Sequence, residues 1–312
     1  MSVIVVGVDG GGTATRVLVT DERGRELASS TGPASAVRPG MASESADIIA
    51  ATVNAALASA GMSHVRPRAI CAGVAGTGRE PDRDALAREL IDRDVADETD
   101  VQTDAAIALA DAFGDGGGVV LVAGTGSMAF GRGPTGRSMR AGGWGPAIGD
   151  EGSGAWIGRR ALSIAAASVD GREPETALVG ALLTACEVAD ASGFIGWAAH
   201  ATPADYSRLV SAVAETAAQG DLRANSLITL AVEDLVLHVR ALARELYGDE
   251  RAAVPVALAG GLMKPGSLVR KRTEHRLKSA VPGGIVHAGE VIPVRGAARA
   301  ALRLVGVVAG SA

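Results

Sequence analysis

The feature that most constrains the fold of this chain is a repeated step in which an apolar strand ends in a glycine loop and the chain continues as another strand. The run from Val3 to Asp9 is β-branched and typical of a buried strand, and Gly10-Gly11-Gly12-Thr13 follows it directly. In the second half of the chain, Val119 to Ala123 leads into Gly124-Thr125-Gly126-Ser127. The recurrence predicts two halves of similar architecture, although their residues differ.

Because each loop follows a strand, its backbone N–H groups can converge on anionic oxygens, and the missing side chains let a phosphate approach closely. Two such loops indicate a polyphosphate ligand, although a single loop is also compatible with a tight turn that binds nothing. A P-loop is excluded, because that motif requires a lysine and the first lysine here is Lys264. Gly124, Gly126 and Ala129 match a dinucleotide fingerprint formally, but such a loop must open a helix, which Pro134 prevents.

The rest of the pattern alternates strands with amphipathic helices and predicts an α/β fold in two domains. We expect an N-terminal domain over 1–115 and a C-terminal domain with a helical layer over 116–293, separated near the glycines of 114–118. A final helix within 294–312 is expected to pack back on the first domain. The other expected strands are 15–21, 25–30, 69–74, 98–103, 128–132 and 254–259, and the other expected helices are 42–61, 81–91, 104–113, 154–168, 175–188, 203–218 and 221–247.

Composition narrows the class of ligand. Aromatic residues make up 3% of the chain and the formal net charge is -5, which argues against single-stranded nucleic acid, duplex DNA and anionic lipid as partners. No run approaches the length of a membrane helix, and the N-terminus lacks the basic segment of a signal peptide. Cys71 and Cys186 are far apart and offer no metal or iron–sulfur spacing. We therefore expect a cytoplasmic protein with a small-molecule ligand.

Two acidic residues follow strands at positions suited to phosphate chemistry. Asp9 immediately precedes the first glycine loop, where it would repel phosphates unless a cation such as Mg²⁺ lay between them; the alternative is an Asx-type turn cap. Asp104 stands where a strand meets a helix, and it could simply cap that helix. If the chain transfers a phosphoryl group, Asp104 is the candidate for taking the proton of the acceptor hydroxyl.

The segment from Arg140 to Ser153 is dense in glycine around two acids and one tryptophan, which is typical of a ligand-facing loop. Asp150 and Glu151 are candidates for binding substrate hydroxyls or helping with a metal, and the alternative is that they cap the following helix. Trp144 is expected to pack in the protein rather than to stack on a ligand. The histidines show no metal-ligand spacing, and no Gly-x-Ser-x-Gly motif of a hydrolase occurs.

Several of these motifs, taken in order, resemble those of the N-acetylglucosamine kinase and BadF/BadG/BcrA/BcrD-type ATPase family, and the resemblance spans nearly the whole chain. It implies the duplicated ribonuclease-H-like fold of the sugar kinase and actin superfamily, with two domains around a nucleotide cleft. The motifs are Asp9-Gly10-Gly11-Gly12-Thr13, Thr103-Asp104-Ala105, Gly124-Thr125-Gly126-Ser127, Gly142-Gly143-Trp144-Gly145, Gly149-Asp150-Glu151-Gly152-Ser153 and Ala259-Gly260-Gly261.

The resemblance also implies a role for each matched residue. Asp104 falls on the family's catalytic base, which deprotonates the sugar 6-hydroxyl for in-line attack on the γ-phosphate of ATP, and Asp9 would hold Mg²⁺ through water. Sugar contacts would come from Asp104, Thr125, Gly143 and Asp150. Nucleotide contacts would come from Gly11, Gly12 and Thr13 in the first loop, from Thr125, Gly126 and Ser127 in the second, and from Gly260 and Gly261 beside the adenosine.

One departure from the family pattern concerns the acceptor. After the third strand the family usually carries an asparagine, and this chain has Ala36 there, so an amide that would hold a sugar hydroxyl is missing. N-acetylglucosamine is the expected acceptor, with glucosamine or an N-acetylmuramic-type sugar as alternatives. A homodimer is also expected. Two further alternatives are a BadF-type activator ATPase, which needs cluster cysteines, and a sugar sensor without catalysis, which usually carries a helix-turn-helix.

Overall fold

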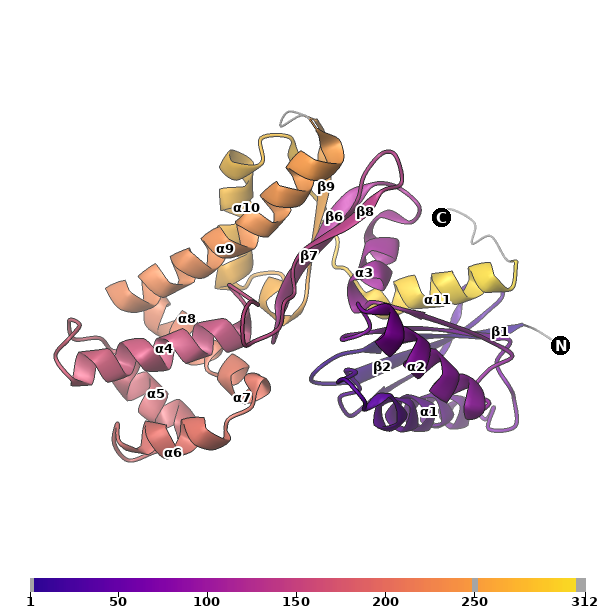
Figure 1. The fold of residues 1–312 in the computed structure, drawn as a ribbon, viewed down its shortest axis with the longest axis horizontal. Coiled ribbons are helices and arrows are strands. Elements are labelled where there is room, and N and C mark those ends of the chain that lie inside the picture. The colour runs from indigo at the N-terminus through magenta and orange to yellow at the C-terminus, as the bar shows by residue number, and fades with distance from the viewer. Residues whose placement is uncertain (1–2, 249–251, 307–312) are drawn as a thin grey trace. The chain divides into compact units, whose positions relative to one another are not determined.

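The computed structural model describes residues 3–248 and 252–306 and divides the chain into two compact units. The first comprises 1–116 together with 291–312, and the second comprises 117–290 (Figure 1). Each unit contains one five-stranded sheet. The chain therefore leaves the first unit once, completes the second, and returns to the first at its C-terminal end.

The sheet of the first unit has the strand order β3-β2-β1-β4-β5. Neighbouring strands are antiparallel from β1 to β3 and parallel from β1 through β4 to β5. Its strands are β1 (Ile4–Gly10), β2 (Thr15–Asp21), β3 (Glu26–Gly32), β4 (Ala69–Val74) and β5 (Glu98–Gln102), and its helices are α1 (Ala42–Ser59), α2 (Glu80–Asp92), α3 (Asp104–Phe113) and α11 (Pro293–Leu304).

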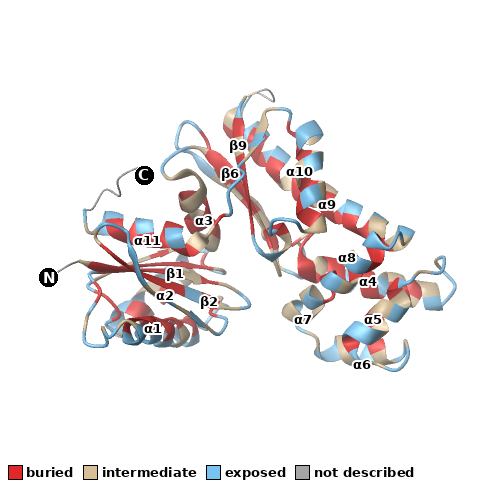
Figure 2. Cartoon of the chain, turned by 180° about the vertical axis from the view of Figure 1, so that it is seen from behind, coloured by how far each residue is buried: buried red, intermediate tan, exposed pale blue. Residues whose placement is uncertain are grey.

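The central strand β1 is buried on both faces, which explains its unbroken β-branched sequence. Val6 and Val8 lie in the cluster that α1 covers, whereas Val5 lies in the cluster formed with α3 and α11. Figure 2 shows the buried sides of these helices in red. A Cβ at Gly7 would lie 2.4 Å from the backbone nitrogen of Ala298, so glycine is what lets α11 cross β1 closely.

The sheet of the second unit repeats this topology, with the order β10-β9-β6-β7-β8. Its first three strands are again antiparallel neighbours, and the last two again add in parallel. Its elements are β6 (Gly118–Ala123), β7 (Ser127–Arg132), β8 (Ser138–Gly142), α4 (Gly154–Val169), α5 (Leu178–Cys186), α6 (Gly193–His200), α7 (Pro203–Arg208), α8 (Val210–Ala218), α9 (Leu222–Tyr247), β9 (Val254–Ala259), the 3-10 turn η1 (Gly261–Met263), α10 (Leu268–Ala280) and β10 (Gly284–Val286).

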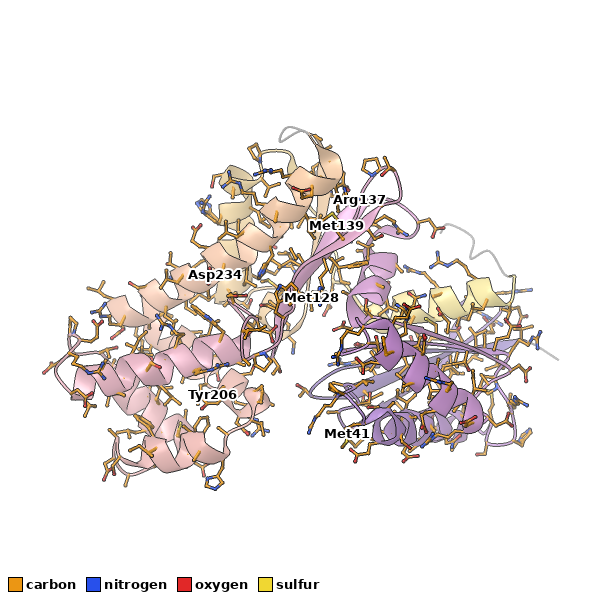
Figure 3. All side chains as sticks on the ribbon, in the orientation of Figure 1. Met41, Met128, Arg137, Met139, Tyr206 and Asp234 are labelled. Atoms are coloured by element: carbon orange, nitrogen blue, oxygen red, sulfur yellow. The ribbon has the colours of Figure 1, made fainter. Side chains whose placement is uncertain are left out.

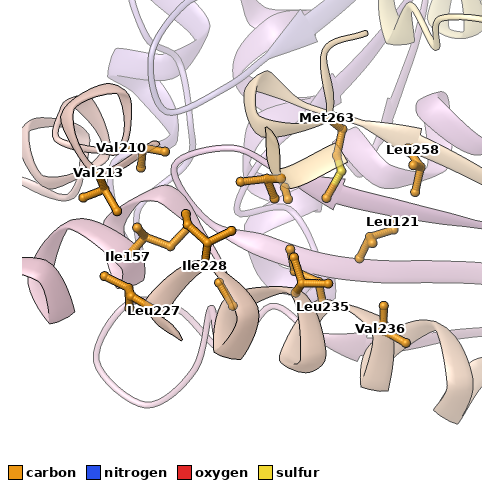
Figure 4. Close-up of a cluster of buried hydrophobic side chains, with 14 of the residues drawn as sticks. Leu121, Ile157, Val210, Val213, Leu227, Ile228, Leu235, Val236, Leu258 and Met263 are labelled. Carbon is orange, nitrogen blue, oxygen red and sulfur yellow. The ribbon is translucent and has the colours of Figure 1, made fainter. Parts of the chain in front are cut away.

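The second core lies between the sheet and the long helix α9, and the helices α4, α5 and α8 extend it. Figure 4 shows Leu121 and Leu258 of the strands facing Leu235 and Val236 of α9. The apolar positions of α9 recur every three to four residues, as an amphipathic helix requires. The expected duplication of an α/β sheet is confirmed by the matching strand orders.

Some expected elements differ from those observed. The helix expected over 203–218 is two helices, because Leu209 donates its N–H to the Tyr206 carbonyl in a tighter, 3-10-like turn. The strands β8 and β10 and the helices α6 and α10 were not expected. The last helix is α11, which ends at Leu304, and residues 307–312 of the expected range lie outside the described residues.

Candidate active site

The first glycine loop joins β1 to β2 and exposes its tip. The Gly11 N–H donates to the Ala14 carbonyl at 3.0 Å, which closes the turn. Gly12 and Thr13 are exposed, and a Cβ at Gly12 would meet no atom within 4 Å. This part of the loop is therefore open to a ligand, as a phosphate contact would require.

The segment that contains Ala36 is fastened to the inner side of this loop. The Gly11 carbonyl accepts the N–H groups of Ser35 and Ala36, each at 3.2 Å. Thr15 Oγ1, which is buried, lies 2.5 Å from the Pro33 carbonyl oxygen and 2.7 Å from Ser35 Oγ. The structure thus places Ala36, where the family usually has an asparagine, directly beside the phosphate-loop candidate.

Asp9 lies near the end of β1 with only 13% of its side chain exposed. Its Oδ2 is 3.4 Å from Nη1 of Arg16. Burial raises the pKa of the Asp9 carboxyl, because a low-dielectric site disfavours the charge, and Arg16 acts in the opposite direction. Asp9 is part of strand β1 rather than of a turn, so the Asx-cap interpretation is not supported.

Asp104 is the first residue of α3, but it is not the cap. Thr103 Oγ1 accepts the Ala106 N–H at 3.1 Å and fills that role, whereas Asp104 Oδ1 accepts the N–H of Ala105 at 2.9 Å. Burial raises the pKa of the Asp104 carboxyl to about 6, and the negative charge of Asp9 adds to the increase. Asp104 therefore combines a half-buried position with a pKa suited to proton transfer near neutrality.

The strand register brings these two carboxylates to the same edge of the sheet. Asp9 of β1 is paired with Gly73 of β4, and Gly73 is paired with Gln102 of β5, which ends just before Asp104. Because the three strands are parallel, their carboxyl ends meet at one edge, which is where open sheets place ligands. The first unit thus concentrates its candidate residues at a single edge.

Sequence reasoning missed the loop that follows β4 at this edge. Thr77 is fully buried, and its Oγ1 lies 2.7 Å from the Val74 carbonyl oxygen and 2.8 Å from that of Gln102. Gly76 has φ +92°, and a Cβ there would lie 2.1 Å from the Val37 carbonyl oxygen. The loop therefore joins the Ala36 segment to the end of β5. Its signal in the sequence was a further strand that ends at a glycine.

The second glycine loop is fixed by the helix α4. The carbonyls of Gly124 and Thr125 accept the N–H groups of Gly154 and Ala155 at 2.8 and 3.2 Å. Ser127 Oγ also donates to the Glu151 carbonyl at 2.6 Å. The two backbone bonds use free N–H groups of the helix N-terminus, and together with the Ser127 bond they order the loop before any ligand binds.

Asp150 lies directly against the second loop. A Cβ at Gly126 would be 2.8 Å from Asp150 Oδ2, and Oδ1 accepts the Gly145 N–H at 3.2 Å. Burial raises the pKa of the Asp150 carboxyl, and the N–H groups of Gly145 and Ser127 partly offset that effect. The cap of α4 is Ser153, whose Oγ accepts the Trp156 N–H, so the capping interpretation of Asp150 does not hold.

Gly143 borders the same loop, since its N–H donates to the Ser127 carbonyl at 3.0 Å. Gly142 before it has φ +73°, and a Cβ there would lie 2.7 Å from Nε2 of His238 on α9. The expectation that Trp144 packs in the protein was wrong, because 66% of its surface is exposed. The flanking Gly143 and Gly145 have φ +69° and +88°, so the chain turns sharply on both sides of the indole.

Gly260 and Gly261 lie beside the second loop as well. Gly260 has φ +95°, and a Cβ there would lie 2.5 Å from the Ala123 carbonyl oxygen. A Cβ at Gly124 would be 3.7 Å from the backbone nitrogen of Gly261. The second unit therefore gathers its candidates around one loop, as the first gathers its own at one sheet edge. The second-unit candidates are Thr125, Gly126, Ser127, Gly143, Asp150, Gly260 and Gly261.

Two general findings accompany this geometry. No helix within residues 3–248 and 252–306 has the length and apolarity to cross a membrane. The same described residues include no group of three or more histidine, cysteine or acidic side chains placed to hold a metal ion by themselves.

Comparison with curated proteins identifies two kinases over most of the chain. An N-acetylmuramic acid/N-acetylglucosamine kinase from Clostridium acetobutylicum is 30% identical over 83% of this chain and 85% of its own length. An N-acetyl-D-glucosamine kinase from Dictyostelium discoideum is 28% identical over 96% of this chain and 98% of its own.

Comparison with solved structures supports the same grouping. The crystal structure of a candidate N-acetylglucosamine kinase from Chromobacterium violaceum superposes with a TM-score of 0.79 at 32% identity, and it covers 94% of this chain and 97% of that one. The family model of the BadF/BadG/BcrA/BcrD ATPases matches residues 6–301. This chain belongs to the BadF/BadG/BcrA/BcrD ATPase family.

Proposed function

We propose that this protein is an ATP-dependent amino-sugar kinase that transfers the γ-phosphoryl group of ATP to the 6-hydroxyl of N-acetylglucosamine. The observation that carries the proposal is Asp104, a half-buried carboxyl with a pKa of about 6 at the sheet edge that also holds Asp9. The names of the two curated relatives support an amino sugar as the acceptor. Glucosamine and N-acetylmuramic acid remain alternative acceptors because of Ala36.

In the proposed reaction, Asp104 accepts the proton of the sugar hydroxyl as its oxygen attacks the γ-phosphorus. The bond from the γ-phosphorus to the β,γ-bridging oxygen breaks, and ADP leaves with that oxygen. The chain itself contributes mainly position and charge. We assign contacts with the nucleotide to Gly11, Gly12 and Thr13, to Thr125, Gly126 and Ser127, and to Gly260 and Gly261. We assign contacts with the sugar to Asp104, Thr125, Gly143 and Asp150.

The first unit fits a magnesium ion held partly by the nucleotide. Mg²⁺ keeps several waters and takes one or two carboxylates plus substrate phosphates, so a cluster of three protein ligands is not required. Asp9 is a mostly buried carboxylate next to the open glycine loop. Its pKa is raised by burial, and a bound cation would lower that pKa again. When bound, the ion would neutralise charge on the phosphates, and Asp9 would hold it through water.

The cysteines favour a kinase over an activator ATPase. Such an activator needs thiolate ligands for an iron–sulfur cluster shared by two subunits. Cys71 and Cys186 are both buried and belong to different units. Burial and the neighbouring Asp100 carboxylate raise the pKa of the Cys71 thiol, which works against a thiolate ligand.

The test is an ADP-release assay over a panel of hexoses and amino sugars. Turnover should depend on the acceptor, and Asp104→Asn should lower kcat by about 100-fold or more, as loss of a general base does. Asp92→Asn, at an exposed position of α2, is the matched control and should leave kcat unchanged. Asp104→Asn should melt no lower than the wild type at neutral pH, because it removes a buried charge. Unchanged turnover in Asp104→Asn would refute the assignment.

A further inference from the structure

The loop from Gly143 to Asp150, which joins β8 to α4, is exposed but fixed. Gly143 donates its N–H to the Ser127 carbonyl at 3.0 Å, and Gly145 donates to Asp150 Oδ1 at 3.2 Å. Between these two anchors the loop presents Trp144, which is largely exposed. An apolar side chain on a fixed loop beside two candidate sugar contacts offers a surface to a ligand.

Arg140 places a positive charge at the base of this loop. Its Nη1 donates to the Gly143 carbonyl at 3.1 Å, and its Cζ lies 5.0 Å from the centroid of the Trp144 ring. The side chain is thus held at two points, although the residue is exposed. One hydrogen bond uses one of five guanidinium N–H donors, which leaves others for a ligand.

The charge of Arg140 is not neutralised within its surroundings. In the described part of the chain, no carboxylate lies within 4.0 Å of the Arg140 guanidinium, whereas Arg16, Arg93 and Arg270 each pair with an acid. A fixed guanidinium without an acidic partner binds a carboxylate through two parallel hydrogen bonds, and it repels an ammonium group.

We propose that Arg140, held by Gly143 and Trp144, selects acceptor amino sugars that carry a carboxylate substituent, an inference that rests on the proposed kinase function. The indole of Trp144 provides the apolar face for the sugar ring, and the guanidinium receives the acid group. Arg140 then discriminates against glucosamine, whose free amine is cationic. N-acetylmuramic acid, which is N-acetylglucosamine with a lactic acid ether, has the required chemistry.

The experiment compares N-acetylmuramic acid with its methyl ester, which keeps the shape and removes the charge. We measure kcat and KM for both acceptors with saturating ATP. The wild type should prefer the acid in kcat/KM by about tenfold or more, which corresponds to about 1.4 kcal/mol, the scale of one charge-assisted contact. Arg140→Met should remove that preference mainly by raising KM for the acid, because binding of the carboxylate is what is lost.

Arg137→Met is the matched control, since it removes the same charge from the same hairpin. Figure 3 shows Arg137 at the β7–β8 turn, at the opposite end of the hairpin from Met128, and a Cβ at Gly143 would lie 3.1 Å from the Cβ of Met128. Arg137→Met should keep the wild-type preference, and Arg140→Lys, which retains the charge, should keep part of it. Melting temperatures of all variants confirm that they are folded.

Two outcomes separate this inference from the proposed function. If N-acetylglucosamine is phosphorylated but the wild type does not prefer the acid over its ester, or if Arg140→Met keeps the preference, the role of Arg140 is refuted and the kinase assignment stands. If no amino sugar is phosphorylated at all, both proposals fail.

Discussion

At the scale of single residues, the charge of one carboxylate of the first unit affects the ionisation of the other. Asp9 and Asp104 lie at one sheet edge, each is desolvated, and the charge of Asp9 raises the pKa of Asp104. Among the residues that the structure describes, an ion pair joins Asp9 to Arg16, and none involves Asp104. Two acids in different environments can perform different tasks, and here the unpaired one has the pKa of a general base.

The raised pKa of Asp104 predicts how the rate depends on pH. Asp104 must be ionised to accept a proton, and its proton-bound form increases as pH falls through about 6. Below that value kcat/KM should fall about tenfold per pH unit, with a plateau above it, because only the ionised fraction reacts. The measurement is kcat/KM for the acceptor in buffers of constant ionic strength. A profile that stays flat to about pH 4.5, well below the raised pKa and close to the range of an ordinary carboxyl, would contradict the role of Asp104.

The sequence located both acids but not their environments. Strand-end positions and the family resemblance suffice to find Asp9 and Asp104, because those signals are local. The exposure of Trp144 and the burial of Thr77 depend on contacts between distant segments. Thr77, for example, bonds to the carbonyl of Gln102 on a neighbouring strand, which no local pattern encodes.

At the scale of elements, each glycine loop is held by a segment distant in sequence. The Ser35 segment holds the first loop through the Gly11 carbonyl, and the start of α4 holds the second through Gly124. The loop carbonyl groups thus bond to these supporting segments, whereas the tip of the first loop at Gly12 stays open. A loop ordered in advance loses less entropy when it binds phosphate.

The open tip predicts the effect of one methyl group. In Gly12→Ala the new Cβ meets no protein atom within 4 Å, so the melting temperature should change little. The added methyl group would displace a phosphate that packs against the loop. We therefore expect weaker nucleotide binding, with KM for ATP raised by about tenfold or more, and a lower rate as well, because a misplacement of about 1 Å can cost about 100-fold. Gly180→Ala on α5, where a Cβ also meets nothing, is the control. An unchanged KM for ATP in Gly12→Ala would exclude contact between Gly12 and the nucleotide.

Element by element, the sequence predicted the buried strands well and the polar elements poorly. The strands 69–74 and 254–259 and the helix 104–113 match the structure, because long apolar runs and helical periodicity mark them. The edge strand β8 contains Ser138 and Arg140 and lacks such a run. In α10 the buried stripe includes Thr273 among many charged residues, which obscures its helical period.

At the scale of the whole molecule, two sheets with the same strand order come from sequences with little identity. In each sheet the glycine loop joins the first two strands, so the duplication places one phosphate-loop candidate in each unit. One difference between the units is a helix: α11, from the C-terminal end of the chain, packs on α3 and β1 of the first unit. Asp104 belongs to the first unit and Asp150 to the second.

The central claim is that ATP is consumed to phosphorylate an amino sugar rather than simply hydrolysed. The most direct measurement is phosphorus–proton correlation NMR of the products formed from MgATP and N-acetylglucosamine. Our account predicts one phosphosugar for each ADP, with the phosphorus coupled to the protons on C6, and no product when Mg²⁺ is removed with a chelator. ADP accompanied by an equal amount of inorganic phosphate, at a rate independent of the sugar, would contradict it.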